Sequence, residues 1–428
     1  MNVSLTAVQT IRGRLFVPGD KSISHRALML GAIAKGKTVV RGLASGEDVR
    51  STRRCLQQLG VSIQENKTEL RVQGNGIAGL TKSATPLDAG NSGTTMRLLS
   101  GILAGQRFET TITGDASLQR RPMRRIIAPL TQMGATISSR ENGCAPLTIQ
   151  GSKLRGIHYQ LPVASAQVKS CVLLAGLYAE GETVVEEKIP TRDHSERLLS
   201  LMGAGISVSS NQYSVISVRA GELHGGEVEV PGDFSSAAFF IAAALLLPDS
   251  ELMIENVGVN PTRTALLEVL REMGATVEIA NLKNESHEPI ADLIVRHQTL
   301  HGTKVFGNRV ALLIDEIPIL AVLATQAEGE THIRDASELR VKESDRLAAL
   351  AYNLRAMGAV VEELADGLVI TGPTKLRGAE IDSFGDHRIA MAFAIAGLLA
   401  DSPTTIREAE CADISFPGFF ETVSRLVR

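Results

Sequence analysis

Six segments of the chain place hydrogen-bonding or cationic side chains directly before an apolar, helix-forming stretch. The first is VPGDKSISHR, residues 17–26, which runs into ALMLGAIA. Comparable starts are DAGNSGTTMR, VASAQVKS, PGDFSSAA, IDEIPILA and FGDHRIAM. A helix N-terminus offers backbone N–H groups without partners and a partial positive charge, so it is suited to binding anions. The six starts therefore predict that the protein handles small anionic molecules.

Helix capping explains only part of this pattern. Ser, Asp and Asn are the residues that helix starts prefer in any case. Capping does not explain Lys21, Arg26, Arg97, Lys169 and Arg388, because a cation in the first turn opposes the helix dipole. The side chains at the six starts are Lys21, Ser22, Arg26; Asn91, Ser92, Gly93, Arg97; Ser165, Gln167, Lys169; Asp233, Ser235; Asp315, Glu316; Asp386, His387 and Arg388.

The elements that position these side chains form an internal repeat. A helix end, a glycine and a β-branched strand recur at LQQLGVSI, LTQMGATI, LSLMGAGI, LREMGATV and LRAMGAVV, spaced by roughly 70 to 85 residues. Each repeat is predicted to contain two helices. One is apolar on every side, as in 237–247 and 389–399, and must be buried; the other is amphipathic, as in Leu347, Leu350 and Leu354. We predict an α/β fold of six such repeats, with sheets outside a core of helices whose N-termini converge.

Three further polar clusters accompany the helix starts. QRRPMRR, residues 119–125, carries four arginines, and TRDHSER, residues 191–197, contains Arg192 and His194. Arginine forks suit carboxylates and phosphates, although a solvated loop face is the alternative for these segments. LRVKESDRL, residues 339–347, is predicted to open an amphipathic helix with Lys342, Glu343 and Arg346 in its first turn. An intrahelical ion pair is the alternative to a catalytic role there.

Composition and missing motifs narrow the chemistry. The net charge is −3 and aromatic residues make up 4%, which disfavours nucleic-acid binding. The longest apolar run is too short to span a bilayer, the N-terminus lacks a secretion signal, and the four cysteines are far apart. Walker-type, HExxH and paired-Cys patterns are absent. We expect a cytoplasmic protein with no metal, cofactor, nucleic-acid or membrane partner, acting by proton transfer and electrostatic stabilisation.

Seven motifs in order along the chain resemble the EPSP synthase family, the 3-phosphoshikimate 1-carboxyvinyltransferases. They are PGDKSISHR, LDAGNSGTTMRL, GDASLQRRPM, ASAQVKS, RVKESDRL, FGDHRIAM and SFPGFF. The resemblance implies a two-domain inside-out α/β barrel with three repeats per domain. One domain would comprise 1–18 and 231–428, the other 19–230, with the active site in the cleft between them. It also implies a monomer that transfers the enolpyruvyl group of phosphoenolpyruvate to the 5-hydroxyl of shikimate 3-phosphate, as a transferase of the shikimate pathway in aromatic amino acid biosynthesis.

The same resemblance assigns roles to individual residues. The catalytic set would be Lys21, Asp315 and Glu343. Shikimate 3-phosphate would be bound by Lys21, Ser22, Arg26, Ser165, Ala166, Gln167, Arg192, Asp315 and Lys342. Phosphoenolpyruvate would be bound by Lys21, Asn91, Gly93, Arg121, Gln167, Arg346, His387 and Arg388. Asp315 would take the 5-hydroxyl proton, and Glu343 would exchange the proton at C3 of phosphoenolpyruvate.

The chain departs from the family pattern at two positions. Ile414 stands where many members have a lysine, and Ala166 stands where others have a serine, for which Arg192 is expected to compensate. Gly93 keeps the small residue that leaves room for glyphosate, so inhibition by this compound is expected.

Two other functions are alternatives. The sister enzyme that transfers enolpyruvate to UDP-N-acetylglucosamine shares the fold, but it has asparagine at the position of Ser22 and a catalytic cysteine that the GDASLQRRP loop lacks. A non-catalytic binding protein on the same fold would need neither Asp315 nor Glu343.

Overall fold

The computed structural model describes residues 1–210 and 213–427, which form two compact units. Unit 1 contains Met1–Pro18, Pro231–Lys283 and Pro289–Arg428, and unit 2 contains Gly19–Val230 and Asn284–Glu288. Each unit has a separate hydrophobic core. Residues 284–288, at the tip of a hairpin, belong to unit 2 although the chain on both sides of them belongs to unit 1.

The described residues form six small sheets, three in each unit. In unit 2 the strand orders are β14(Glu227–Glu229)-β3(Lys35–Arg41)-β5(Glu69–Asn75)-β4(Ser62–Glu65), β6(Leu87–Asp88)-β7(Glu109–Thr113)-β9(Leu147–Gln150)-β8(Thr136–Ser138) and β10(His158–Gln160)-β11(Glu182–Glu187)-β13(Ser214–Arg219)-β12(Ile206–Ser210). In unit 1 they are β2(Arg12–Phe16)-β15(Glu251–Gly258)-β17(Glu288–Arg296)-β16(Glu278–Glu285), β18(Lys304–Val305)-β19(Gly329–Ile333)-β21(Gly367–Gly372)-β20(Val360–Leu364) and β22(Glu380–Asp382)-β23(Thr404–Arg407)-β1(Val3–Leu5). The sheets share one pattern, in which the first two strands named pair in parallel and the next pair is antiparallel.

Each repeat also contributes one buried and one amphipathic helix, as the sequence predicts. The buried helices are α1(Lys21–Ile33), α3(Gly93–Ala104), α5(Ala166–Gly176), α7(Phe234–Leu246), α10(Ile317–Gln326) and α12(His387–Gly397). The amphipathic ones are α2(Glu47–Gln58), α4(Arg124–Gln132), α6(His194–Leu201), α8(Ala265–Glu272), α11(Arg346–Ala356) and α13(Phe419–Leu426). Short elements complete the set: α9(Asn308–Leu313), η1(Leu118–Arg120), η2(Ser337–Val341) and η3(Ala409–Ile414). The predicted α/β architecture of six repeats is confirmed.

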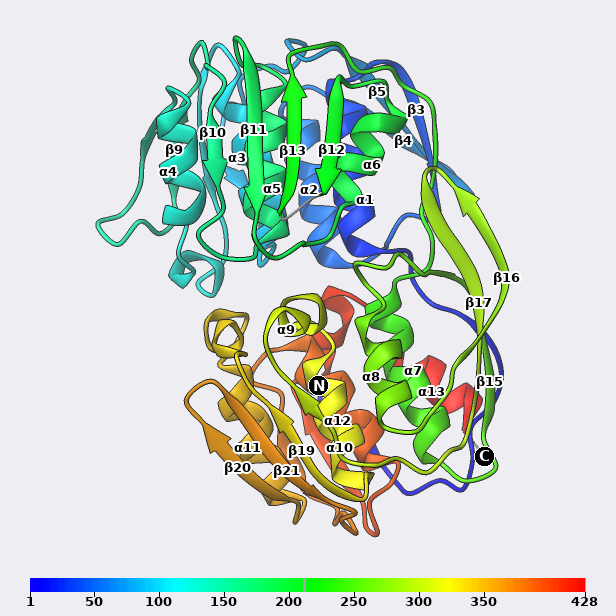
Figure 1. The fold of residues 1–428 in the computed structure, drawn as a ribbon. Helices are drawn as coiled ribbons and strands as arrows, with labels where there is room; N and C mark the ends of the chain where they lie inside the picture. The colour runs from blue at the N-terminus through cyan, green and yellow to red at the C-terminus, as the bar shows by residue number, and fades with distance from the viewer. Residues whose placement is uncertain (211–212, 428) are drawn as a thin grey trace. The chain divides into compact units, whose positions relative to one another are not determined.

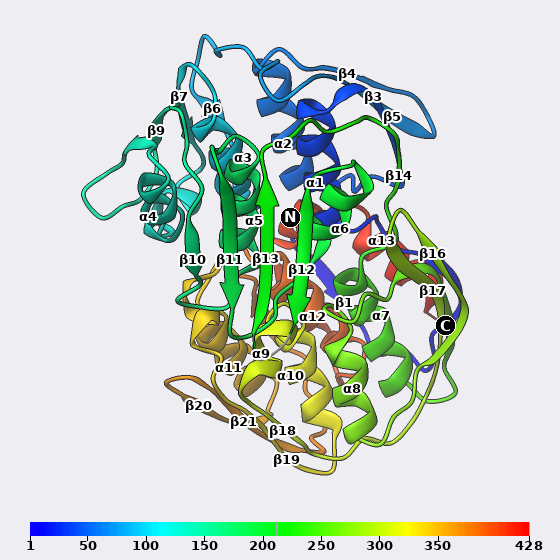
Figure 2. The same cartoon turned by 45° about the horizontal axis from the view of Figure 1, so that its top comes forward.

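Within each unit the sheets cover the buried helices from outside. The strands β10, β11, β13 and β12 lie in front of α3 and α5 in both views (Figures 1 and 2). In unit 1, α7, α10 and α12 pack against one another. In unit 2, α3 packs against α5 so closely that a Cβ at Gly101 would lie 2.3 Å from the carbonyl oxygen of Cys171. Only glycine permits this approach of two backbones.

Five of the six buried helices begin at predicted polar residues whose side chains cap them, whereas Glu316 before α10 makes no side-chain cap. Asp20, Ser92, Ser165, Asp233 and Asp386 each accept a backbone N–H from the first turn that they precede. Each such cap satisfies one of the N–H groups that a helix leaves without a partner. The five repeat glycines follow the amphipathic helices with positive φ, the conformation that ends a helix at least cost.

The two ends of the chain complete the sixth repeat together. β1, near the N-terminus, pairs antiparallel with β23, and α13 supplies the sixth amphipathic helix. Among the described residues, no helix combines the length and the apolar character needed to cross a membrane.

Candidate active site

In unit 1, the guanidinium of Arg346 lies beside three carboxylates. Its Nε donates to Asp386 Oδ2 at 2.7 Å, and its Nη2 donates to Glu343 Oε2 at 2.7 Å. Its Nη1 lies 3.6 Å from Asp315 Oδ1. Arg346 is buried, with 1% of its surface exposed. The two carboxylates expected to transfer protons, Asp315 and Glu343, are therefore brought together on one fixed cation.

The helix that carries Arg346 begins later than predicted. Asp345 is its N-cap and accepts the N–H of Ala348 at 3.1 Å, so α11 starts at Arg346. Lys342 and Glu343 precede the helix, between η2 and α11, rather than in its first turn. Glu343 and Arg346 form an ion pair across the N-cap, the contact that the sequence offered as the alternative to a catalytic role.

Burial and charge act in opposite directions on this cluster. Burial alone would raise the pKa of Asp386, but the charge and hydrogen bond of Arg346, together with His387, outweigh burial and the pKa is lowered. Burial alone would lower the pKa of Arg346, but the carboxylates of Asp386, Glu343 and Asp315 raise it. The cation is thus kept charged in a buried position.

The start of α12 adds another predicted cation of unit 1. Arg388 Nη1 donates to the backbone oxygen of Asp315 at 2.9 Å, and its Nε lies 3.7 Å from Asp315 Oδ1. Asp386 caps this helix through the N–H of Arg388. His387, the first residue of α12, is buried. The predicted residues Asp315, Arg346 and Arg388 therefore form one contiguous group.

In unit 2, the first turn of α1 presents Lys21. Its Nζ lies 2.9 Å from Oδ2 of Asp48, a residue of α2. The lysine side chain is 17% exposed and the aspartate side chain 10%. The sequence carries no motif that predicts the role of Asp48, because Asp48 reaches Lys21 only through the packing of α2 against α1.

Arg26, one turn further along α1, has all three guanidinium nitrogens bonded. Nε donates to Ser195 Oγ and Nη2 to Ser170 Oγ, each at 2.7 Å, while Nη1 donates to the backbone oxygen of Ser22 at 2.8 Å. The pKa of Arg26 is lowered to about 10, mainly by burial; nearby Arg192 acts in the same direction, and acidic neighbours such as Glu196 oppose it. Arg192, which is also predicted to bind shikimate 3-phosphate, is therefore close enough to act electrostatically on Arg26.

The start of α3 joins a second group of predicted residues. Arg121 donates to Asn91 Oδ1, and Asn91 in turn donates to Asp115 Oδ2 at 2.7 Å. Arg97 donates to Gln167 Oε1 at the start of α5. A Cβ added at Gly93 would lie 3.4 Å from Arg97 Nη1 and 3.5 Å from Arg121 Nη1.

Lys169 differs from the other cations at helix starts. Its side chain is 1% exposed, and its Nζ lies 2.9 Å from Glu187 Oε2 and 2.7 Å from Glu196 Oε1. These two carboxylates balance the charge of the Lys169 ammonium within unit 2. Its position at the start of α5 is therefore explained without an anionic ligand.

The two residues that depart from the family pattern, Ile414 and Ala166, occupy positions that suit apolar side chains. Ile414 packs against the hydrophobic core of unit 1, and Ala166 is the first residue of α5, after the Ser165 cap.

Comparison with known proteins identifies the family. The family model described as EPSP synthase (3-phosphoshikimate 1-carboxyvinyltransferase) matches residues 5–423. The chain is 56% identical over 421 residues to the 3-phosphoshikimate 1-carboxyvinyltransferase of Synechocystis sp., covering 98% of this chain and 94% of that protein. The protein of the same name from Synechococcus sp. is 54% identical over 429 residues, covering 99% and 96%.

Solved structures agree with this assignment. The EPSP synthase of Acinetobacter baumannii superposes with a TM-score of 0.88 at 45% identity, covering 100% of this chain and 98% of that one. The enolpyruvyl transferase NikO of Streptomyces tendae shares the fold, with a TM-score of 0.79 at 17% identity, covering 99% and 96%. The chain therefore belongs to the EPSP synthase (3-phosphoshikimate 1-carboxyvinyltransferase) family.

Proposed function

We propose that the protein transfers the enolpyruvyl group of phosphoenolpyruvate to the 5-hydroxyl of shikimate 3-phosphate and releases phosphate. The observation that carries the proposal is the placement of Asp315 and Glu343 on either side of Arg346, in a chain that matches the family over nearly its whole length. Two carboxylates held beside one buried guanidinium suit a reaction that moves protons next to anionic substrates.

The reaction is an addition followed by an elimination, and each stage removes one proton and delivers another. The 5-hydroxyl oxygen bonds to C2 of phosphoenolpyruvate and loses its proton to Asp315, while C3 gains a proton from Glu343. In the resulting tetrahedral intermediate, Glu343 takes back a proton from C3 while the bond from C2 to the phosphate oxygen breaks, which restores the double bond. The departing phosphate takes up one proton, which balances the hydroxyl proton that Asp315 received. Arg346 contacts both carboxylates and orients them relative to one another. Lys21 would bridge both substrates and assist proton transfer.

The remaining predicted residues would bind the substrates. Arg26 and Arg192 supply positive charge for the phosphate of shikimate 3-phosphate, with hydrogen bonds from Ser22, Ser165, Gln167, Lys342 and the backbone of Ala166. Phosphoenolpyruvate would lie among Asn91, Gly93, Arg121, Gln167, Arg346, His387 and Arg388. Since each set draws residues from both units, we propose that the units are two domains that close on the substrates. The monomeric state and the cytoplasmic location stay predictions.

The assay that tests the function is phosphate release by the purified protein. We expect release only when phosphoenolpyruvate and shikimate 3-phosphate are both present. Release with UDP-N-acetylglucosamine in place of shikimate 3-phosphate would favour the sister reaction. Absence of release under every condition would favour a non-catalytic binding protein.

The space beside Gly93 predicts a specific change in glyphosate inhibition. Gly93→Ala should fold normally, because the new methyl would make ordinary contacts with the tips of Arg97 and Arg121 and meet no backbone atom. The methyl would occupy space beside Arg121, so glyphosate should be excluded more than the smaller phosphoenolpyruvate. We expect the inhibition constant to rise by about tenfold or more, on the order of the loss from one misplaced contact. Inhibition curves measured against phosphoenolpyruvate check this, and equal curves for both proteins would contradict it.

A further inference from the structure

The turn of the β16–β17 hairpin is bonded to unit 2 at three successive residues. Ser286 Oγ accepts the N–H of Glu229 at 2.9 Å, and the backbone oxygen of His287 accepts Nη1 of Arg197 at 2.6 Å. Glu288 Oε1 accepts Nδ1 of His194 at 2.7 Å. These bonds explain why residues 284–288 belong to unit 2.

The backbone of this turn is under conformational constraint. Ser286 and His287 are the two residues between β16 and β17, and both have positive φ, 49° and 64°. Tight hairpin turns of this kind normally use asparagine or glycine there. Residues other than glycine keep such backbone angles only where the surrounding structure holds them. The position of Glu288 is therefore set by the turn as well as by its own hydrogen bond.

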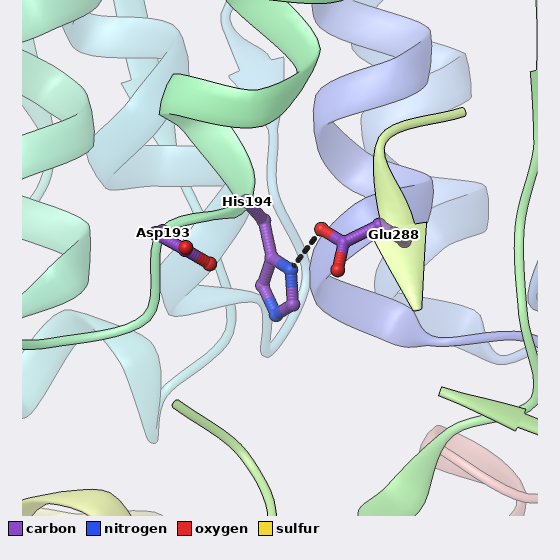
Figure 3. Close-up of side chains that lie close together, drawn as sticks. All are labelled: Asp193, His194 and Glu288. Carbon is purple, nitrogen blue, oxygen red and sulfur yellow. Dashed lines mark hydrogen bonds and ion pairs between the residues drawn. The ribbon is translucent and has the colours of Figure 1, made fainter. Parts of the chain in front are cut away.

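Glu288 and His194 form a buried pair rather than an open set of ligands. Both residues are 1% exposed. Asp193 lies beside them, and the candidate ligand atoms of the three residues are within 4.8 Å of one another (Figure 3). However, Asp193 Oδ2 already accepts Nε of Arg197 at 2.8 Å, and Glu288 occupies Nδ1 of His194. The carboxylate of Glu288 thus fixes the imidazole that opens α6.

The next residue of α6 carries this constraint to Arg26. Ser195 Oγ accepts Nε of Arg26 and donates to Ser170 Oγ, each at 2.7 Å. Arg26 is 3% exposed, so its fork is oriented by these hydroxyls rather than by solvent. The negative charge of Glu288 also acts on Arg26 directly and raises its pKa against the effect of burial. The pair therefore influences Arg26 by geometry and by charge.

We infer that Glu288 is a positioning residue for shikimate 3-phosphate, acting through His194 and the first turn of α6 on Arg26. The inference rests on the proposed assignment of Arg26 to this substrate. If Glu288 has this role, substrate affinity in unit 2 depends on the turn of the β16–β17 hairpin, although most of that hairpin belongs to unit 1.

Steady-state kinetics of His194→Ala and Glu288→Ala test the inference. Each variant should raise KM for shikimate 3-phosphate by about tenfold, the effect of losing a buried hydrogen bond to a charged group. The KM for phosphoenolpyruvate and kcat should change by less than about twofold, because only binding of one substrate is weakened. The double variant should be no worse than either single variant. His194→Asn, whose Nδ2 can replace Nδ1 as donor, should restore most of the affinity.

Matched controls separate positioning from general stability. Glu330→Ala removes an exposed His–Glu pair, His332 Nε2 to Glu330 Oε2 at 3.0 Å, and should leave both KM values unchanged. If Glu288→Ala does not fold, Glu288→Asp carries the test, because it keeps the charge but shortens the reach to His194, and it should raise the same KM several-fold. A lowered melting temperature with unchanged KM, or an equal rise of both KM values, would overturn the inference.

Two further variants distinguish this inference from the proposed function. Arg26→Lys and Arg192→Lys should each raise KM for shikimate 3-phosphate, since lysine cannot form the bidentate fork. If neither does, the assignment of the phosphate site is wrong. If both do while the Glu288 and His194 variants behave like the wild type, only the positioning role is wrong.

Discussion

Replacing Asp315 with asparagine is expected to lower kcat by about 10²–10⁴-fold, the usual contribution of a positioned general base. The amide has nearly the same shape and can still face Arg346 and Arg388, but it cannot accept the proton of the 5-hydroxyl. Binding of shikimate 3-phosphate should persist, because Lys21, Arg26 and Arg192 are unchanged. Phosphate release measured at saturating concentrations of both substrates, together with a direct binding measurement, checks this result.

Asp401→Asn is the matched control for this substitution. Asp401 is exposed in the same unit, and its nearest cation, Lys375 Nζ, lies 3.8 Å away. Its replacement should leave kcat unchanged. If Asp315→Asn retained kcat within a few-fold of the wild type, Asp315 would not be the base, and the proposed proton transfer would have to begin elsewhere.

Replacing Arg346 with leucine is expected to have the largest effect on stability. The variant would leave Asp386, which has no exposed surface, and part of Glu343 buried without their cation. Breaking a buried ion pair by removing one partner costs about 3–5 kcal/mol. Chemical denaturation at neutral pH should show this loss in the free energy of unfolding. Arg334→Leu removes an exposed ion pair with Asp366 and should cost less than about 1 kcal/mol.

The effect of Arg346→Leu should depend on pH. In the wild type the pKa of Asp386 is lowered, so its ionised form contributes stability that is present above about pH 4 and is lost as the pH falls through the folded-state pKa. In the variant, burial without the guanidinium should raise that pKa, and protonation then relieves the unpaired charge. The difference between the two proteins should therefore narrow on acidification. A difference independent of pH would show that lost packing, not the unpaired carboxylate, explains the destabilisation.

The starts of the buried helices could be predicted from sequence because local chemistry determines them. Asp20, Ser92 and Asp233 cap helices through hydrogen bonds to residues two or three positions ahead. Glycine after the amphipathic helices marks their ends in the same local way. Such signals lie within a few residues of the feature that they predict.

Contacts between distant segments could not be predicted in this way. Asp386 bonds to Arg346 from forty positions along the chain, and Asp48 bonds to Lys21 from a neighbouring helix. The predicted start of α11 is wrong, because the helix is capped by Asp345 and not by an earlier residue. The turn at 284–288 carries no motif that reveals its partners His194 and Arg197, which depend on tertiary packing alone.

We propose above all that the helix starts of both units bind the same pair of substrates. A crystal structure of the protein with shikimate 3-phosphate and glyphosate tests it most directly. We predict that Lys21 and Gln167 of unit 2 and Asp315 and Arg346 of unit 1 will all contact these ligands. Ligands held by the side chains of one unit alone, with Lys21 far from Arg388, would contradict the claim.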